Sequence, residues 1–141
     1  MEIICYEKMV KITEDYCSYE VAKLFEEKGF PINEHLFMYV NKDGKLMTDH
    51  QACLTMTNEE YRTFFDDYIP TVTQALAMKW LREEQGIVIT IDYDEDEDCE
   101  DNERYGFTVY RKNKRKIDLA TFPTYEESVE AALKYCLTEL I

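Results

Sequence analysis

Residues 72–141 read VTQALAMKWLREEQGIVITIDYDEDEDCEDNERYGFTVYRKNKRKIDLATFPTYEESVEAALKYCLTELI. Apolar residues alternate with more polar ones over residues 87–93, the period of a half-buried β-strand. Residues 105–111 and 117–121 predict two further strands, and the polar residues 112–115 between them predict a turn. The pattern therefore predicts three consecutive antiparallel strands.

Helices are predicted on both sides of these strands. Residues 72–85 have an apolar face, with Thr71 and Gln74 as a possible capping box and Gly86 as a stop. Thr124 and Glu127 form a second capping box. The apolar stripe behind it comprises Val129, Ala132, Leu133, Cys136, Leu137 and Leu140. This order predicts an α+β fold in which two helices cover one face of an antiparallel sheet.

The N-terminal half predicts smaller elements. Residues 19–28 have helical spacing and end at Gly29, which can adopt a positive φ. Residues 35–40 and 45–48 flank an Asp-Gly pair and predict a hairpin. Residues 49–56 lack a clear period and are predicted to form a loop.

An aromatic helix is predicted next, starting at a capping box of Thr57 and Glu60 and ending at Pro70. Its aromatic face comprises Tyr61, Phe64, Phe65 and Tyr68. These four residues are candidates for binding a partner. The alternative, which we favour because apolar stripes usually face a core, is packing between residues 1–69 and 70–141 of a single domain 1–141.

The chain is strongly acidic, with 16 Lys and Arg against 30 Asp and Glu and a formal charge of −14. Such a charge repels nucleic acid and anionic membranes and favours a partner with a basic surface. The five cysteines, an odd number, follow no disulfide or zinc pattern, as expected of reduced thiols in the cytoplasm. No signal peptide or membrane span is predicted, so we expect a soluble cytoplasmic protein.

One acidic segment resembles a calcium-binding ladder. Carboxylates stand at positions 1, 3, 5, 7, 9 and 12 of a twelve-residue loop, as Asp92, Asp94, Asp96, Asp98, Glu100 and Glu103. Glu97 stands where a calcium loop needs glycine, and the flanking segments predict strands rather than helices. We therefore favour a solvated strand connection over a metal site.

No pattern indicates catalysis or a cofactor. His50 and Cys53, beside Asp49, are zinc-ligand types, but His35 is the only other histidine. A cysteine nucleophile is formally possible, although no activating motif surrounds any cysteine. Phosphate-binding glycine loops and hydrolase motifs are missing from the sequence. We expect a protein without catalytic residues, cofactor or structural metal.

A basic segment follows the acidic one. Its cations are Arg104, Arg111, Lys112, Lys114, Arg115 and Lys116, with Tyr105, Phe107 and Tyr110 between them. Aromatic and basic residues alternating on strands can bind single-stranded nucleic acid. Because the overall charge opposes a polyanion, we favour a hairpin that neutralises the acidic loop or simply solvates its own turn.

Three segments resemble a known group of sequences. They are CSYEVAKLFEEKGF (17–30), IPTVTQALAMKWLREEQGI (69–87) and FPTYEESVEAALKYCLTELI (122–141). They are similar to segments of small uncharacterised acidic proteins borne by prophages and other mobile elements of gut anaerobic bacteria. The resemblance covers most of the chain except residues 46–68. It implies an accessory protein of a mobile element and assigns no chemistry.

The αβββα order of residues 72–141 also resembles double-stranded-RNA-binding domains and the related fold of some antitoxins. In that family, lysines at the start of the last helix contact phosphates. The corresponding segment here has Glu126, Glu127 and Glu130. The reversed charge argues against RNA binding, because carboxylates repel phosphate.

Three functions follow from this sequence. The first is a non-catalytic accessory protein that acts through contact with a basic protein surface. The second is an acidic decoy that imitates nucleic-acid charge and occupies a host protein. The third is a divergent nucleic-acid-binding or antitoxin-type module that uses the basic hairpin.

Overall fold

The computed structural model describes residues 14–31, 38–112 and 114–141, with the side chains of residues 117–120 outside that description. Its fold is α+β. The N-terminal half contains α2 (Tyr19–Glu27), β1 (Met38–Val40), β2 (Leu46–Met47), α3 (Asp49–Thr55), α4 (Asn58–Arg62), α5 (Phe64–Asp67) and β3 (Ile69–Thr71). The C-terminal half contains α6 (Gln74–Glu84), β4 (Val88–Tyr93), the short 3₁₀ turn η2 (Asp101–Glu103), β5 (Tyr105–Arg111), β6 (Lys114–Phe122), α7 (Tyr125–Tyr135) and a π-helical turn η3 (Cys136–Leu140).

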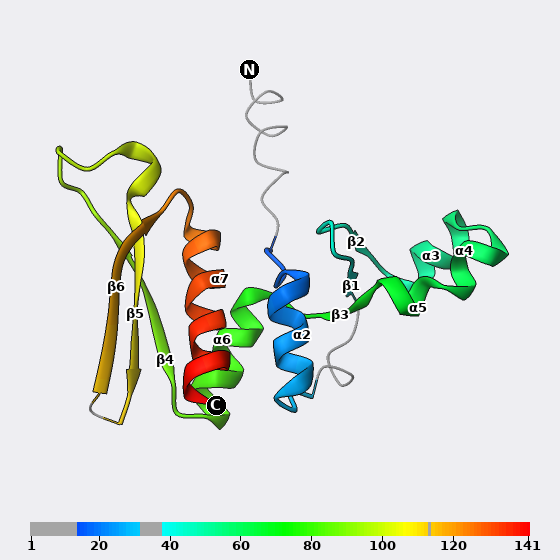
Figure 1. The fold of residues 1–141 in the computed structure, drawn as a ribbon, viewed down its shortest axis with the longest axis horizontal. Helices are drawn as coiled ribbons and strands as arrows, with labels where there is room; N and C mark the ends of the chain where they lie inside the picture. Colours follow the sequence, from blue (N-terminus) through cyan, green and yellow to red (C-terminus); the bar gives the residue numbers. More distant parts are fainter. Residues whose placement is uncertain (1–13, 32–37, 113) are drawn as a thin grey trace, which may run out of the picture.

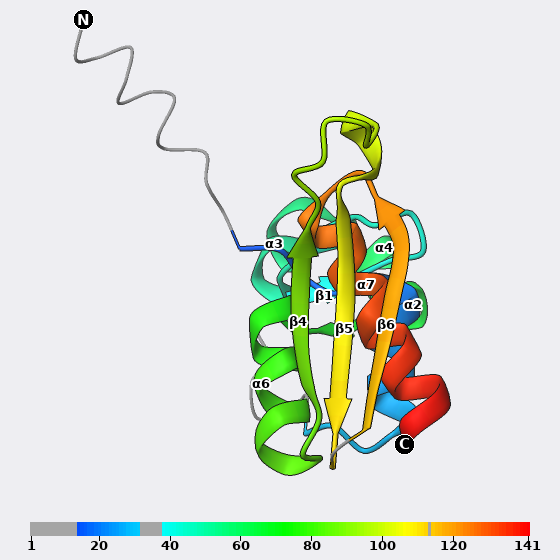
Figure 2. The same cartoon turned by 90° about the vertical axis from the view of Figure 1, so that its left-hand side faces the viewer.

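The C-terminal half forms the predicted layers. Strands β4, β5 and β6 are antiparallel neighbours in sequence order, with Ile89 opposite Val109. Helices α6 and α7 lie on one face of this sheet, and the other face is uncovered by helices (Figures 1 and 2). The buried face contributes Phe107 and Val109 to the main core. The predicted helix, three strands and helix are confirmed.

Strand β6 begins earlier than predicted. Lys114 pairs with Arg111 and Lys116 with Val109, so residues 114–116 extend the ladder instead of belonging to a polar turn. Their charges suggested a turn, but all three side chains are exposed near the end of the ladder, so a strand there buries none of the charges. The connection shrinks to residues 112 and 113, and Lys112 has a φ of 45°.

Helix α6 is capped by Thr73 rather than by the predicted pair of Thr71 and Gln74. The Thr73 hydroxyl accepts a hydrogen bond from the Leu76 amide at 3.2 Å. Thr71 belongs to β3, where its buried hydroxyl donates to the Cys17 carbonyl at 2.8 Å. The strand therefore uses the threonine that resembled a cap, and the helix begins two residues later than predicted.

Helix α7 begins at the predicted cap, because the Thr124 hydroxyl accepts from the Glu127 amide at 3.1 Å. The predicted apolar stripe faces the main core, with Leu140 partly buried at its end. On the same helix the hydroxyl of Ser128 is buried and makes no hydrogen bond within the described part of the chain. A buried hydroxyl without a partner costs free energy.

Replacing Ser128 with alanine should therefore raise the free energy of unfolding by about 1 kcal/mol, because the change removes an unpaired polar group and favours the helix. Ser18→Ala is the contrasting variant. It removes a hydroxyl that caps α2 and donates to Glu130 at 2.8 Å, and should lower stability by about 1 kcal/mol. Urea unfolding curves measure both. A destabilised Ser128→Ala protein would show that the hydroxyl has a partner.

The main core also includes the first described helix. Helix α2 covers residues 19–27, as the sequence predicted within one residue, and Ser18 caps it. The Phe25 ring is buried edge-on against Phe30 at 5.1 Å and Trp80 at 5.7 Å between centroids. This aromatic group attaches α2 to α6, so the N-terminal helix is part of the C-terminal layers.

A second, smaller cluster lies away from the sheet of β4, β5 and β6, at the right in Figure 1. It contains five buried residues, Tyr39, Met47, Ala52, Phe64 and Tyr68. The hairpin β1–β2 is confirmed in its described part, with Tyr39 opposite Met47, and residues 35–37 lie outside the described residues. Strand β3 pairs with β1 and leads back to the main core.

The predicted loop at residues 49–56 is wrong. Residues 49–55 form helix α3, which starts at a capping box of Thr48 and Gln51. The period escaped detection because Ala52 is the one buried residue of this short helix. The capping box of Thr57 and Glu60 is confirmed, but Thr63 divides the predicted aromatic helix into α4 and α5.

Across the described residues, no helix combines the length and apolarity needed to cross a bilayer.

Candidate protein-binding site

The loop between β4 and β5 is built around Arg104. Its guanidinium donates to the carbonyls of Asp94 (2.8 Å), Asp96 (3.1 Å) and Cys99 (3.1 Å). Both Nε and Nη2 also donate to one carboxylate oxygen of Asp101, at 3.2 and 3.1 Å. The Arg104 side chain is 16% exposed. One arginine therefore organises a segment, residues 94–103, that carries eight carboxylates.

Three of the carboxylates that resembled a calcium-binding ladder have separate hydrogen-bond partners. Asp92 lies in β4 and accepts from the Thr108 hydroxyl at 2.8 Å. The carboxylates of Asp94 and Asp96 accept from backbone amides two residues on, at 2.9 and 3.1 Å. Within the described ranges, no group of three or more acidic, His or Cys side chains is placed to hold a metal. The converging carbonyls hold an internal guanidinium, and we assign no metal to the loop.

Three tyrosines connect this loop with the start of α7. Tyr93 and Tyr105 face each other across β4 and β5 with ring centroids 5.2 Å apart, and Tyr105 lies 6.4 Å from Tyr125. Tyr93 is 55% and Tyr125 44% exposed. Aromatic rings with polar tips suit a surface that binds a partner, because they bury much area with few rotatable bonds. Of the three, the sequence singled out only Tyr105, as part of the basic and aromatic segment, although the predicted strand pairing implied its contact with Tyr93.

The first turns of α7 add more carboxylates beside a cleft of about 270 Å³. Its acidic lining comprises Asp15, Glu126, Glu127 and Glu130. Glu130 is fixed by the Ser18 amide and hydroxyl, at 3.0 and 2.8 Å, and by the Gln74 side chain at 3.2 Å. None of the described residues that line this cleft is Lys or Arg.

Desolvation, together with the neighbouring Glu126, raises the pKa of the Asp15 carboxyl. Like charges crowded at one place disfavour the ionised form, and a cation brought beside them removes that penalty. The acidic lining of the cleft therefore favours binding of a positively charged group.

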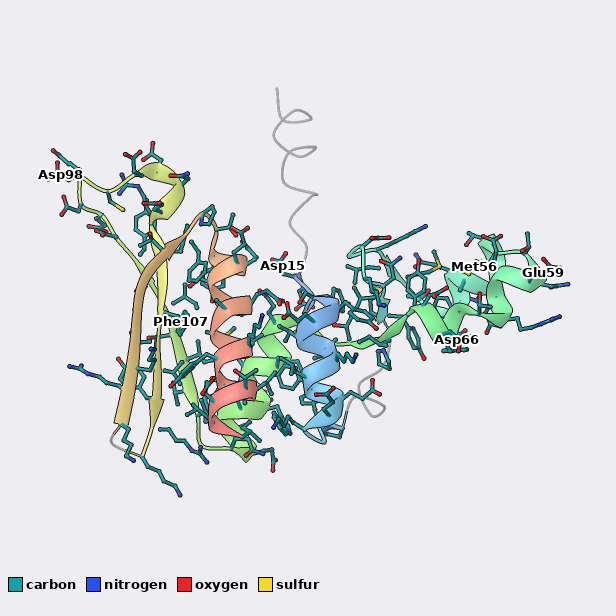
Figure 3. All side chains as sticks on the ribbon, in the orientation of Figure 1. Asp15, Met56, Glu59, Asp66, Asp98 and Phe107 are labelled. Atoms are coloured by element: carbon teal, nitrogen blue, oxygen red, sulfur yellow. The ribbon has the colours of Figure 1, made fainter. Side chains whose placement is uncertain are left out.

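We call these surfaces together the acidic end: residues 94–103, the three tyrosines, and the acidic lining of the cleft. Figure 3 shows Asp98 on the loop and Asp15 beside α7 on the same, upper side of the molecule, with the α7 N-terminus between them. The carboxylates thus gather from three separate segments of the chain.

The four aromatic partner candidates lie elsewhere, in the second cluster. Phe64 and Tyr68 are buried there, Tyr61 is partly buried, and Phe65 is 54% exposed. Phe64 and Phe65 pack against Tyr39, and the cluster lies within the N-terminal half rather than between the two halves, so that expectation is wrong. Their role in binding a partner stays a prediction, carried chiefly by Phe65.

The other chemical candidates are dispersed. His50 and Cys53 are exposed on α3, and the nearby Tyr61 hydroxyl donates to Asp49 at 2.6 Å, which raises the Tyr61 pKa. Burial raises the pKa of the Cys17 thiol well above its usual value and that of Cys136 to about 12. These two thiols are poor nucleophiles, because the thiolate is the reactive form. Cys17, Cys53, Cys99 and Cys136 are free thiols.

The basic hairpin does not neutralise the acidic loop, contrary to one of our expectations. The loop follows β4 at one end of the sheet, and the turn from β5 to β6 lies at the other (Figure 1). Arg104 alone of the six cations belongs to the loop. The acidic loop and the basic hairpin are close in sequence, but the extended strand β5 separates their charges.

No family model, curated protein or solved structure matches this chain.

Proposed function

We propose that this protein is a non-catalytic accessory protein of a mobile element, acting in the cytoplasm by binding a basic protein surface at its acidic end. The observation that carries the proposal is the gathering of carboxylates from three segments around exposed tyrosines. The resemblance of three segments to prophage-borne proteins supports the accessory role. Five cysteines without a disulfide pattern suit a reducing compartment.

Arginine-rich surfaces fit this site best. A guanidinium stacks on tyrosine and pairs with carboxylates in a planar fork, whereas a lysine ammonium does neither as well. Tyr93 and Tyr125 offer the exposed rings, and in sequence the acidic loop follows Tyr93 and Glu126 and Glu127 follow Tyr125. The site therefore predicts a preference for arginine over lysine in the partner.

A peptide of alternating arginine and glycine is a suitable probe, titrated calorimetrically at about 150 mM salt. The test variant is Glu95→Gln, Glu97→Gln, Asp98→Asn, whose side chains make no hydrogen bond to other described residues. We expect the variant to bind at least about tenfold more weakly, because several carboxylate contacts are lost. A peptide of the same length in which lysine replaces each arginine should bind the wild-type protein more weakly than the arginine peptide.

The matched control is Glu26→Gln, Glu27→Gln, Glu84→Gln. Glu26 and Glu27 are exposed residues of α2, and Glu84 is the exposed last residue of α6. It changes the formal charge by the same amount, so it should keep the affinity within about twofold if the site is local. Equal losses in both variants would show that net charge alone attracts the peptide. Failure of the wild-type protein to bind would reject the acidic end as a site.

The decoy function is the second candidate, favoured by the same concentration of carboxylates at one end. A decoy occupies the nucleic-acid site of its target protein. Duplex DNA should therefore compete with this protein for the target, and the fraction of target bound to this protein should fall as the DNA concentration rises. A partner that binds DNA and this protein together would exclude the decoy. Direct binding of nucleic acid at the acidic end is disfavoured, because the loop and Glu126, Glu127 and Glu130 repel phosphate.

A further inference from the structure

The end of the β5–β6 hairpin carries five cations in six residues: Arg111, Lys112, Lys114, Arg115 and Lys116. Two hollows of about 250 and 370 Å³ lie beside it, and both are lined by Arg111, Lys114 and Arg115. Tyr135 borders the first hollow and Tyr110 the second. Neither hollow has an Asp or Glu among its described lining residues.

Two of the five cations are held in place by α7 and η3. The Arg111 guanidinium donates to the Leu140 carbonyl at 2.6 Å, and the Lys116 ammonium lies 5.5 Å from the centre of the Tyr135 ring. Lys112, Lys114, Arg115 and Lys116 are exposed, and Arg111 is partly buried. Over the described side chains, none of the five pairs with a carboxylate. Their charge is thus available to a ligand.

The acidic end does not cancel this charge. Strand β5 runs from Tyr105, next to the acidic loop, to Arg111, and its six steps span about 20 Å. The Debye length at physiological salt is about 8 Å, so the two ends are more than two screening lengths apart. A small anion at the hairpin responds to the local cations and not to the formal charge of the chain.

Lys112 occupies a backbone position that disfavours lysine. Its φ of 45° lies in the left-handed region, where glycine or asparagine is preferred in a two-residue hairpin turn. The turn therefore carries a positive charge at some cost in stability. Stability of the turn does not explain a lysine at this position, because glycine would suit the backbone better. A role in binding does explain it.

We propose that the two hollows form a binding site for a compact multivalent oxyanion, a chain of two or more phosphates such as inorganic triphosphate or the triphosphate of a nucleotide. Arg111 and Lys116 provide charges held by contacts with η3 and α7, and Lys112, Lys114 and Arg115 close around the ligand. Arg111, Lys114 and Arg115 line both hollows, so adjacent phosphates of one short chain can contact the same three cations. A nucleotide base has Tyr110, 42% exposed, as a stacking surface.

Long nucleic acids are a separate case. A duplex spans more phosphates than five clustered cations can neutralise, and its remaining charge faces the acidic protein. We expect inorganic triphosphate and ATP to bind. A duplex or a single strand should not bind more tightly than triphosphate, because its additional phosphates find no further cations. This binding would be independent of the acidic end and of the proposed partner.

The test is calorimetric titration of the full chain with inorganic triphosphate, ATP, and a twelve-nucleotide single strand and duplex, without added metal. The test variant is Lys112→Gly, Lys114→Gln, Arg115→Gln, and the control is Lys23→Gln, Lys42→Gln, Lys79→Gln, which removes the same charge from exposed sites elsewhere. We expect submillimolar triphosphate binding, at least about tenfold weaker in the test variant. The control should change the affinity by about twofold or less.

Lys112→Gly alone gives a readout that a structural role cannot imitate. It should raise the melting temperature, since it relieves the left-handed lysine, and still weaken triphosphate binding. Equal losses in the test and control variants, or no triphosphate binding by the wild-type chain, would overturn the proposal. Tighter binding of the single strand than of triphosphate would assign the hairpin to nucleic acid instead. Self-association abolished by the test variant would assign it to the acidic end of a second copy.

Discussion

The Phe25→Ala protein should lose about 3–5 kcal/mol of its free energy of unfolding, the range for removal of a buried phenylalanine ring. Phe25 is fully buried and contacts the rings of both Phe30 and Trp80. Its removal leaves a cavity between α2 and α6 that two aromatic side chains border, so neighbouring groups can fill it only in part. The loss should be seen in urea unfolding at constant pH.

Phe65→Ala is the matched control, because it makes the same chemical change at a ring that is 54% exposed. We expect it to cost about 1 kcal/mol or less. Similar losses in the two variants would show that α2 is not anchored through Phe25. A larger loss for Phe65→Ala would make the second cluster the principal source of stability.

The Arg104→Gln protein should lose the order of residues 94–103 while the strands persist. The guanidinium makes five hydrogen bonds in the loop, three of them to carbonyls. Without it, eight carboxylates repel one another and three carbonyls lose their common donor. Amide hydrogen exchange in the loop should approach the rate of an unstructured peptide, with protection retained in the centre of β5.

Calcium gives a second readout for the same residue. Carbonyl and carboxylate oxygens are calcium ligands, and the Arg104→Gln loop offers both without an internal cation. Calcium should therefore raise the melting temperature of this variant more than that of the wild-type protein, at equal concentration. Arg82→Gln on α6, an exposed residue, is the control. Unchanged loop protection in Arg104→Gln would contradict the role assigned to the guanidinium.

Most of the C-terminal layers could be predicted from the sequence because each apolar pattern there has one cause, burial in the main core. The alternation at residues 87–93 and the stripe from Val129 to Leu140 both arise from burial against one core. Predictions failed where a residue had two possible partners. Thr71 resembled a cap but its hydroxyl bonds to Cys17, and only the pairing of β3 decides between the two.

The candidate site was harder to predict because it joins distant segments. The acidic loop was evident from composition, but the contact of Tyr105 with Tyr125 depends on the placement of α7 against β5. Arg104 was the available signal, one cation within an acidic run. Its role depends on carbonyl directions, which residue types do not encode. The cleft with Asp15 likewise exists only when the N-terminal segment meets α7.

The division of the buried residues into two clusters means that local stability differs along the chain. The second cluster, with five buried residues, can open as a separate cooperative unit, since sub-global unfolding follows such contiguous groups. The single tryptophan, Trp80, packs beside Phe25 in the main core, so its fluorescence is insensitive to that opening. Circular dichroism includes the helices of both clusters. The two signals therefore describe the clusters separately, and their urea midpoints coincide only if the whole chain unfolds in one step.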